Sequence, residues 1–311
     1  MTERASAFTT RTSVDICVCT YRRAQLETTL RSLIAQNAPE LVLRVVVADN
    51  DAEPSAKPLV EQIAKEASFD IVYVHAPERN ISIARNACLD SALGDWVAFI
   101  DDDETAPPNW IATLTAAALA RSYDVVFGPA LAVYPEGTPE WIRNGDYHTN
   151  RVPVHDGIVC TGHTCNALIR WKETSWTNER FLLQKGRTGG EDVEFFFRLW
   201  RAGLSLGVCD EAPVYETTAP NRLTYRWIWR RRFLAGQFHG AHSEPAEASK
   251  SDLIAHRTRL LLGSGVKAAY CALRAIAGVS TPATWRKWAI RSGFHAGVCA
   301  GALGLRQREQ Y

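Results

Sequence analysis

Three kinds of signal are missing from this 311-residue sequence: zinc-ligand spacing, long apolar runs and a leader peptide. Its eight cysteines form no CxxC pair, and several lie inside apolar segments, as is typical of free thiols in a reducing compartment. No run reaches 18 uncharged apolar residues; the longest late candidate, 292–305, has 14, too few to cross a bilayer. Residues 1–13 contain no apolar core of signal-peptide length, so we expect a cytoplasmic protein.

The sequence also lacks the motifs of several large enzyme classes. It contains no G-x-G-x-x-G after an expected strand, no P-loop, no H-E-x-x-H and no G-x-S-x-G. An ordinary dinucleotide oxidoreductase, nucleotide triphosphatase, zinc protease or serine hydrolase is therefore not predicted.

The composition is that of a globular protein, with 46% hydrophobic and 22% charged residues, but the charge is unevenly distributed. Residues 221–311 hold 15 Lys and Arg against 4 Asp and Glu, whereas residues 1–220 carry a net negative charge. A basic C-terminal region suggests a polyanionic partner, such as a membrane surface or a diphosphate. The alternative is a solvated basic helix face.

Strand and helix patterns alternate over the first 130 residues, which predicts an α/β fold with a mostly parallel sheet flanked by helices. Apolar runs predict strands at 14–20, 41–48, 71–75, 96–100, 125–133, 167–171 and 213–216. Helical periodicity predicts helices at 24–36, 59–67, 82–93, 109–121, 191–202, 223–239, 253–277 and 282–303. We expect a flexible N-terminus (1–13), a main α/β domain (14–240) and a basic helical extension (241–311).

Polar residues come at the ends of three expected strands. They are the triplets 20–22 (Thr-Tyr-Arg), 49–51 (Asp-Asn-Asp) and 101–103 (Asp-Asp-Asp). Open α/β sheets bind ligands outside the carboxyl ends of their strands. Three such ends therefore predict a binding site at this edge of the sheet.

The acidic triplet suits a metal ion bound together with a diphosphate. In an extended chain, Asp101 and Asp103 point to the same side, while Asp102 points away. Neighbouring carboxylates repel each other, and a divalent cation relieves that repulsion. Mg²⁺ prefers one or two carboxylates together with substrate phosphates. A solvated acidic loop is the alternative interpretation.

Three further residues are candidates for contact with a nucleotide. Asp49, at a strand end, can accept hydrogen bonds from a nucleobase or ribose, or it can cap a turn. Arg79 and Arg85 flank an expected helix start, where they can neutralise phosphate oxygens or form structural ion pairs.

Two glycines precede Glu191 and Asp192 at another expected helix start. In the functional interpretation, Asp192 is a general base that takes a proton from an acceptor hydroxyl. In the alternative, these acids only cap the helix. His163, in an expected loop, is a candidate for metal or acceptor contact, and Glu216 is similarly ambiguous.

Five segments together resemble glycosyltransferase family 2, whose members have the GT-A fold. Their order and spacing match that family from about Val14 to Gln237. The segments are VDICVCTYRR (14–23), VADND (47–51), RN with ARN (79–80, 84–86), FIDDDE (99–104) and GED (190–192). The DDDE form, with RRF (231–233) and GQ (236–237), is most similar to glucosyltransferases of succinoglycan-type exopolysaccharide assembly.

The resemblance implies a donor site and an acceptor site. Thr20, Tyr21 and Asp49 would hold the uridine of a UDP-sugar, Arg85 and Arg79 would hold its phosphates, and Arg22 and Asp102 would lie on the same donor site. Asp101 and Asp103 would form the DxD pair, with Asp103 as the direct ligand of Mn²⁺ or Mg²⁺. Asp192 would be the base of an inverting transfer, and Glu191, His163 and Glu216 would lie on the acceptor side.

The expected reaction is the transfer of one hexose, with glucose as the first candidate, to a lipid-linked oligosaccharide or related glycan. The Gln-x-x-Arg-Trp motif of processive synthases is absent. Four tryptophans interleaved with Arg and Lys suit the interface of an anionic bilayer, where an acceptor on a polyprenyl diphosphate would lie. They are Trp227, Trp229, Trp285 and Trp288. We therefore expect peripheral attachment to the inner face of the plasma membrane; packing on the protein itself or on a second subunit is the alternative.

Two other functions stay open at this point. A sugar nucleotidylyltransferase also uses paired aspartates, but it usually has a glycine-rich loop after its first strand, and residues 20–23 contain no glycine. A non-catalytic domain that recruits partners to membranes would not need both the acidic pair and Asp192.

Overall fold

The computed structural model describes residues 11–242 and 249–305, so most of the expected N-terminal segment 1–13 lies outside the described residues. The chain divides into two compact units. Of the described residues, the first unit, called here the sheet unit, comprises 11–132 and 149–216. The second, called the helical unit, comprises 133–148, 217–242 and 249–305. The domain limits predicted from the sequence, 14–240 and 241–311, differ from this division and remain a prediction.

The sheet unit is built on a seven-stranded sheet in the order β3-β2-β1-β4-β8-β6-β9. The strands β3, β2, β1 and β4 are parallel to one another. Strand β8 is antiparallel to both β4 and β6, and β6 and β9 are parallel. The prediction of a mostly parallel sheet is therefore confirmed. The strands are β1 (Thr12–Thr20), β2 (Leu41–Asp49), β3 (Ile71–His75), β4 (Trp96–Asp101), β6 (Val125–Phe127), β8 (Asn166–Arg170) and β9 (Leu206–Val208).

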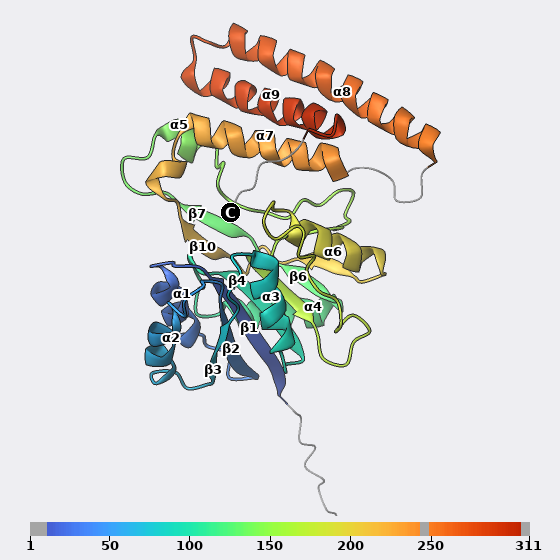
Figure 1. The fold of residues 1–311 in the computed structure, drawn as a ribbon. Coiled ribbons are helices and arrows are strands. Elements are labelled where there is room, and N and C mark those ends of the chain that lie inside the picture. The colour runs from blue at the N-terminus through green and yellow to red at the C-terminus, as the bar shows by residue number, and fades with distance from the viewer. Residues whose placement is uncertain (1–10, 243–248, 306–311) are drawn as a thin grey trace, which may run out of the picture. The chain divides into compact units, whose positions relative to one another are not determined.

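Helices cover both faces of this sheet (Figure 1). On one face, α1, α2 and α4 pack leucine, isoleucine and tryptophan side chains against alternate strand residues such as Ile16 and Val47. On the other face, α3 and α6 pack against the intervening residues, such as Cys17 and Val46. This alternation is the period of two that an extended strand imposes. The helices are α1 (Leu26–Ile34), α2 (Lys57–Ala64), α3 (Ile81–Asp90), α4 (Trp110–Arg121) and α6 (Glu191–Arg201).

The predicted strand at 125–133 is wrong as a single element. The structure has β6 in the large sheet and then β7 (Ala130–Val133) in a second sheet of order β5-β10-β7, with β5 (Glu104–Thr105) and β10 (Val214–Thr217). The break falls at Gly128 and Pro129. A Cβ on Gly128 would lie 2.2 Å from the carbonyl oxygen of Ala212, and proline has no N–H for a ladder. The two short strands β5 and β9 carry too few residues for a sequence pattern.

The start of α3 also differs from the prediction. The helix predicted at 82–93 begins at Ile81; Asn80 is its N-cap, and the side-chain oxygen of Asn80 accepts a hydrogen bond from the Ser82 backbone N–H at 3.0 Å. The backbone N–H of Asn80 in turn donates to the side-chain oxygen of Asn50, at 2.8 Å. The helix start is therefore attached to the segment that follows β2.

The helical unit has its own small core, formed by Ile142, Ile228 and Ile290. Its elements are α5 (Glu140–Arg143), a 3₁₀ turn (Pro220–Arg222), α7 (Tyr225–His242), α8 (Lys250–Ala277) and α9 (Pro282–Ala302). The predictions of the three long helices are confirmed, with ends that differ by three residues or fewer.

Within the described part of the chain, one helical stretch, 251–277 in α8, is long and apolar enough to cross a membrane. The prediction that no segment is long enough to cross a bilayer is too strict, because it considers only runs without charged residues. Charged residues interrupt this stretch without ending its apolar character; they are Asp252, Arg257, Arg259, Lys267 and Arg274.

Glycines bring the backbones of α7 and α9 into direct contact. A Cβ on Gly236 or Gly240 of α7 would lie 2.0 or 2.1 Å from a carbonyl oxygen of α9. A Cβ on Gly297 or Gly301 of α9 would lie 2.0 Å from a carbonyl oxygen of α7. Spacing by four residues places these glycines on one face of each helix. We call this contact the glycine seam.

Replacing Gly297 by Ala is expected to destabilise the protein by about 1–3 kcal/mol, because the new methyl group meets the Phe233 carbonyl and the two backbones must separate. Thermal unfolding of the purified variant measures this effect. The matched control is Gly263→Ala in α8, where a Cβ meets nothing within 4 Å. That exposed helical site should gain up to about 1 kcal/mol from better helix propensity. Equal melting temperatures for Gly297→Ala and the wild type would contradict the close contact.

Candidate functional site

The three polar strand ends lie side by side at the carboxyl edge of the large sheet. Thr20 at the end of β1 pairs with Asp49 at the end of β2. On the other side of β1, Cys19 pairs with Asp101 at the end of β4. The prediction that these triplets gather at one edge is therefore confirmed.

The acidic triplet does not have the extended conformation that the sequence prediction assumes for it. Asp101 ends β4, but Asp102 and Asp103 lie in a turn before β5. The Asp102 carboxylate accepts a hydrogen bond from the Thr20 hydroxyl at 2.7 Å. Asp102 and Asp103 both also lie near Arg23, with N–O distances of 3.3 and 3.5 Å. The hydrogen bond between Thr20 and Asp102 ties β1 to the acidic turn.

Burial makes negative charge costly in this turn. Burial raises the pKa of Asp101 to about 7; Arg85 opposes the shift, and Asp103 adds to it. The pKa of Glu104 is raised well above its ordinary value, first by burial and then by the charge of Asp101. Glu104 is almost fully enclosed, and one of its oxygens accepts a hydrogen bond from the Asp101 backbone N–H at 2.9 Å. Such a group of enclosed acids is stabilised by an added positive charge.

Glu104 is a residue that the sequence prediction does not select, and Glu216 is one that it does. In the small sheet, Glu216 of β10 lies opposite Glu104 of β5. The charge of Glu216 contributes to the raised pKa values of both Asp101 and Glu104. Glu216 is thus placed beside the acidic turn. Within the described residues, no group of three or more His, Cys, Asp or Glu could hold a metal ion.

Arg85 connects the acidic turn with the start of α6. Its guanidinium is buried and forms an ion pair with Glu191, and it lies 5.5 Å from the centre of the Phe181 ring. The pKa of Glu191 is raised, mainly by burial, although Arg85 opposes this. The second carboxylate oxygen of Glu191 is buried without a hydrogen-bond partner. The sequence leaves open whether Arg85 contacts phosphate oxygens or forms a structural ion pair. The structure shows an ion pair with Glu191.

Asp192 lies beside His163. Its Oδ2 is 3.1 Å from Nδ1 of His163, and its Oδ1 accepts a hydrogen bond from the Val193 backbone N–H at 2.7 Å. Burial alone would raise the pKa of Asp192, but the hydrogen bond and charge of His163, together with Arg85, lower it overall. Both glycines before this helix have positive φ, +86° at Gly189 and +81° at Gly190, which a residue with a Cβ rarely adopts. They turn the chain so that α6 begins with these acids.

Asp49 is fully buried, and its carboxylate already accepts three hydrogen bonds within the protein. The donors are the backbone N–H groups of Asp51 (3.1 Å) and Ala56 (2.8 Å) and the hydroxyl of Tyr73 (3.0 Å). The capping interpretation of Asp49 therefore has direct structural support. The side chain of Asn50, which the sequence does not single out, joins Ala76 and Asn80 in the same region.

Tyr21, Arg22 and Arg79 form an exposed cluster next to this edge. The guanidinium carbons of Arg79 and Arg22 lie 5.4 and 5.6 Å from the centre of the Tyr21 ring. Arg22 also forms an ion pair with Asp51 at 2.7 Å and has a left-handed backbone with φ of +50°. Non-glycine residues with this left-handed backbone conformation are uncommon and are enriched at functional sites.

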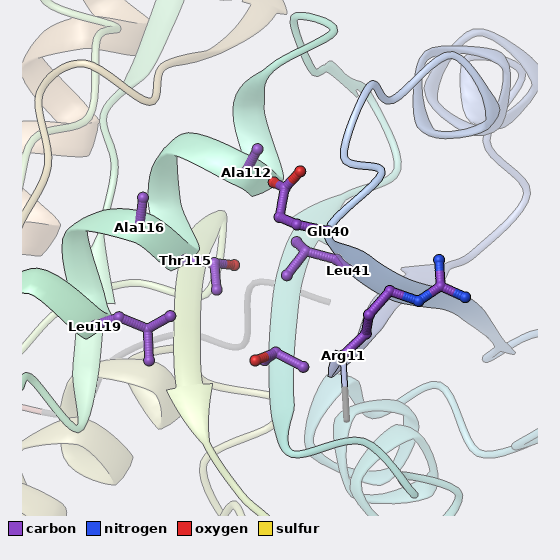
Figure 2. Close-up of a pocket in the computed structure, with 8 residues that line it drawn as sticks. Arg11, Glu40, Leu41, Ala112, Thr115, Ala116 and Leu119 are labelled. Carbon is purple, nitrogen blue, oxygen red and sulfur yellow. The ribbon is translucent and has the colours of Figure 1, made fainter. Parts of the chain in front are cut away.

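A cavity of about 400 Å³ lies elsewhere in the sheet unit (Figure 2). It is bordered by Arg11 and Thr12 at the start of β1, by Glu40 and Leu41 at the start of β2, and by one side of α4. These are the amino ends of the strands, away from the acidic turn. Its lining contains no pair of acids, so the chemistry described above does not extend to it.

Comparisons with known proteins agree with this architecture. The model of Glycosyl transferase family 2 matches residues 15–172, and that of Glycosyl transferase family group 2 matches residues 96–298. The succinoglycan biosynthesis protein ExoM of Rhizobium meliloti (strain 1021) is 44% identical over 299 residues, which cover 96% of this chain and 95% of that protein.

Two solved structures share the fold at low sequence identity. The mannosyltransferase PcManGT from Pyrobaculum calidifontis, in complex with GDP-Man and Mn²⁺, has a TM-score of 0.63 at 18% identity, over 96% of this chain and 89% of that one. GalNAc-T7 with UDP, GalNAc and Mn²⁺ has a TM-score of 0.55 at 13% identity, over 78% of this chain and 53% of that one. Both carry the GT-A fold expected from the sequence. Because the family model covers half of the sequence and the similarity to ExoM extends over nearly all of it, the chain belongs to glycosyl transferase family 2.

Proposed function

We propose that this glycosyltransferase moves a hexose, with glucose as the first candidate, from a UDP-sugar to a lipid-linked oligosaccharide or related glycan during exopolysaccharide assembly. The observation that carries the proposal is the position of Arg85, whose buried charge acts on Asp101, Glu191 and Asp192 together. The acids of the expected donor and acceptor sites thus belong to one electrostatic cluster. The similarity to ExoM over the whole chain supports the exopolysaccharide assignment.

The donor nucleotide would lie along the carboxyl edge of β1, β2 and β4. The exposed ring of Tyr21, with the guanidinium groups of Arg79 and Arg22 near it, offers a stacking surface for the base and positive charge for the phosphates. Thr20 and Asp102 border the same place through their mutual hydrogen bond. For Asp49, we narrow the role to holding the segment after β2 in position, since its carboxylate already accepts three hydrogen bonds from within the protein.

The acidic turn fits a hard divalent cation. Its donors are all carboxylate oxygens, their negative charge is costly in the enclosed turn, and Mg²⁺ or Mn²⁺ at such sites takes its remaining ligands from substrate phosphates and water. Asp103 would hold the ion directly, with Asp101 beside it. When bound, the ion would supply positive charge that stabilises the leaving diphosphate. Arg23, which lies within 3.5 Å of Asp102 and Asp103, would keep the turn in shape.

Asp192 would act as the general base on the acceptor side. The acceptor oxygen would form a bond to the anomeric carbon while its proton passes to a carboxylate oxygen of Asp192, and the bond from the anomeric carbon to the diphosphate would break. A single displacement of this kind inverts the anomeric configuration. His163 would orient the carboxylate through the contact at Oδ2, and Glu191 would be held away from the acceptor by Arg85.

The protein would work in the cytoplasm, at the inner face of the plasma membrane, where a polyprenyl-diphosphate acceptor is accessible. The excess of Lys and Arg after residue 220 supports this location. The two rival functions are less well supported. Neither a nucleotidylyltransferase nor a recruitment domain accounts for the position of Asp192 beside His163 and its coupling to Arg85.

A donor panel tests the proposal. Purified protein is mixed with UDP-glucose, UDP-galactose, UDP-N-acetylglucosamine and GDP-mannose, and nucleoside diphosphate release is measured with Mn²⁺, with Mg²⁺ and with a chelator. We expect release from one UDP-sugar that depends on the metal ion and rises when acceptor is added. Release from GDP-mannose alone would overturn the choice of uridine, and equal release with the chelator would overturn the metal role.

A further inference from the structure

One face of α8 is apolar along most of its length and is exposed. It is defined by Ile254, Leu262, Val266, Leu273 and Ile276, whose exposed fractions are 66% to 70%. At 100° per residue these side chains fall on one side of the helix. We call this surface the α8 apolar face. Large aliphatic side chains repeated in one line over more than twenty residues are unusual on a surface that faces only water.

The opposite side of α8 is already occupied by α9, which runs alongside it (Figure 1). Ser264 and Cys271 are buried on that side. The Ser292 hydroxyl of α9 donates a hydrogen bond to the carbonyl of Ala268 at 2.9 Å. The apolar face therefore points away from α9, the helix against which α8 packs along its length.

The tryptophans expected at a membrane interface pack against other side chains of the helical unit. Trp227 stacks on His148 at 5.2 Å, and Trp285 lies 5.2 Å from the ring of Tyr225. Trp288 lies 5.8 Å from the ring of Tyr270 and 4.8 Å from the guanidinium carbon of Arg274. These rings are half-buried. The structural alternative to membrane contact thus accounts for the tryptophans, but it leaves the α8 apolar face uncovered.

The net positive charge of α8 and α9 indicates which kind of partner would bind the α8 apolar face. Residues 250–302 contain eight Lys and Arg and a single acid, Asp252. Lys267 and Arg274 are exposed and lie seven residues apart on one flank of α8, between the apolar face and the side that packs on α9. A second copy of this chain would bring an equal positive charge against the first. An anionic lipid surface is complementary in both respects, because it offers acyl chains for the apolar face and phosphates for the long side chains of these two cations.

The same two cations favour a helix that lies in the membrane surface over one that crosses it. In a crossing helix, Lys267 would lie near the middle of the bilayer and Arg274 about 10 Å further along the axis, which is unfavourable for both. In a helix parallel to the surface, their long side chains reach the headgroups while the apolar face enters the acyl boundary.

We infer that the α8 apolar face binds an anionic bilayer, with α8 parallel to the membrane surface and Lys267 and Arg274 on lipid phosphates. This assignment rests on the membrane location proposed above and identifies the surface responsible for it. It leaves the glycosyl transfer chemistry to the sheet unit.

The test is binding of the full-length protein to vesicles at physiological salt. Vesicles of phosphatidylcholine with phosphatidylglycerol should sediment the wild type, and vesicles of phosphatidylcholine alone should bind it much less. Leu262→Glu with Leu273→Glu should reduce binding by at least about tenfold for each residue, because two buried leucines are lost from the acyl boundary. Lys267→Gln and Arg274→Gln should each reduce binding to the anionic vesicles by about fivefold.

The matched control is Leu93→Glu in the sheet unit, since Leu93 is equally exposed, at 72%, and should leave vesicle binding unchanged. Nucleoside diphosphate release from the donor in solution is measured for every variant, so that a failed reaction and a failed membrane contact are told apart. The inference is overturned if the double leucine variant still sediments with anionic vesicles. It is also overturned if the wild type is a dimer that this variant converts to a monomer without any vesicle binding.

Discussion

Replacing Asp192 by Asn is expected to lower the rate of sugar transfer by about 10²–10⁴-fold while donor binding stays close to that of the wild type. The amide keeps the size of the side chain and can still interact with His163 at 3.1 Å, but it cannot accept the acceptor's proton. The rate is measured as nucleoside diphosphate release with saturating acceptor, and donor affinity is measured separately by calorimetry.

Glu194→Gln is the matched control, because Glu194 lies in the first turn of the same helix and pairs with Arg198 away from the acidic turn. It should keep near wild-type transfer. His163→Gln gives a second comparison, since a positioning role predicts a smaller loss than Asp192→Asn. If Asp192→Asn retains more than about a tenth of the transfer rate, another residue is the base.

Replacing Asp103 by Ala is expected to abolish turnover that depends on Mn²⁺ or Mg²⁺ and to leave the fold intact. The side chain contributes a carboxylate to the acidic turn, and its protein partner is a single ion pair with Arg23 at 3.5 Å. Arg23 retains Asp102 as a partner in the variant, so the turn keeps its tie to β1. Donor turnover is measured across a series of Mn²⁺ concentrations.

Asp210→Ala is the control for Asp103→Ala, because Asp210 is an exposed acid paired only with Arg151 among the described contacts. It should leave both the metal dependence and the melting temperature unchanged. Thermal unfolding of Asp103→Ala is expected to resemble that of the wild type, since the loss of one ion pair at 3.5 Å is offset by the loss of repulsion between Asp103 and Asp101. Turnover in Asp103→Ala with an unaltered dependence on Mn²⁺ would remove this residue from the metal site.

Sequence patterns predict the sheet and the position of its active edge well. Strands such as β1 and β2 are nearly continuous apolar runs because both of their faces are covered by helices. Parallel pairing then brings the residues that end each run to the same edge. The placement of Thr20, Asp49 and Asp101 together at that edge therefore follows from the strand pattern alone.

The contacts within the site cannot be predicted in the same way, because they join residues far apart in the sequence. Arg85 pairs with Glu191 across more than a hundred residues, and nothing near either residue in the sequence indicates the other. The pattern treats residues 101–103 as extended and does not predict the turn in which Asp102 and Asp103 lie. Glu104 is missed because an acid after three aspartates gives no sign that it will be buried.

The C-terminal helices show a different limit of sequence patterns. Their helical periodicity is clear, but amphipathic periodicity does not say which neighbour covers which face. The tryptophans that suggest a membrane surface pack on rings within the helical unit, whereas α8 exposes leucine and valine. The glycines of α7 and α9 carry a signal, since small residues spaced by four are typical of close helix pairs, but the signal does not say which helices pair.

The glycine seam restricts how this region can be exchanged among related proteins. The backbones of α7 and α9 are in direct contact, so the surface of each helix must match the surface of the other. Although α8 lies between them in the sequence, a chimera that takes α9 from a relative must take α7 as well. The apolar face of α8 takes no part in this seam, so a change there requires no matching change in α7 or α9.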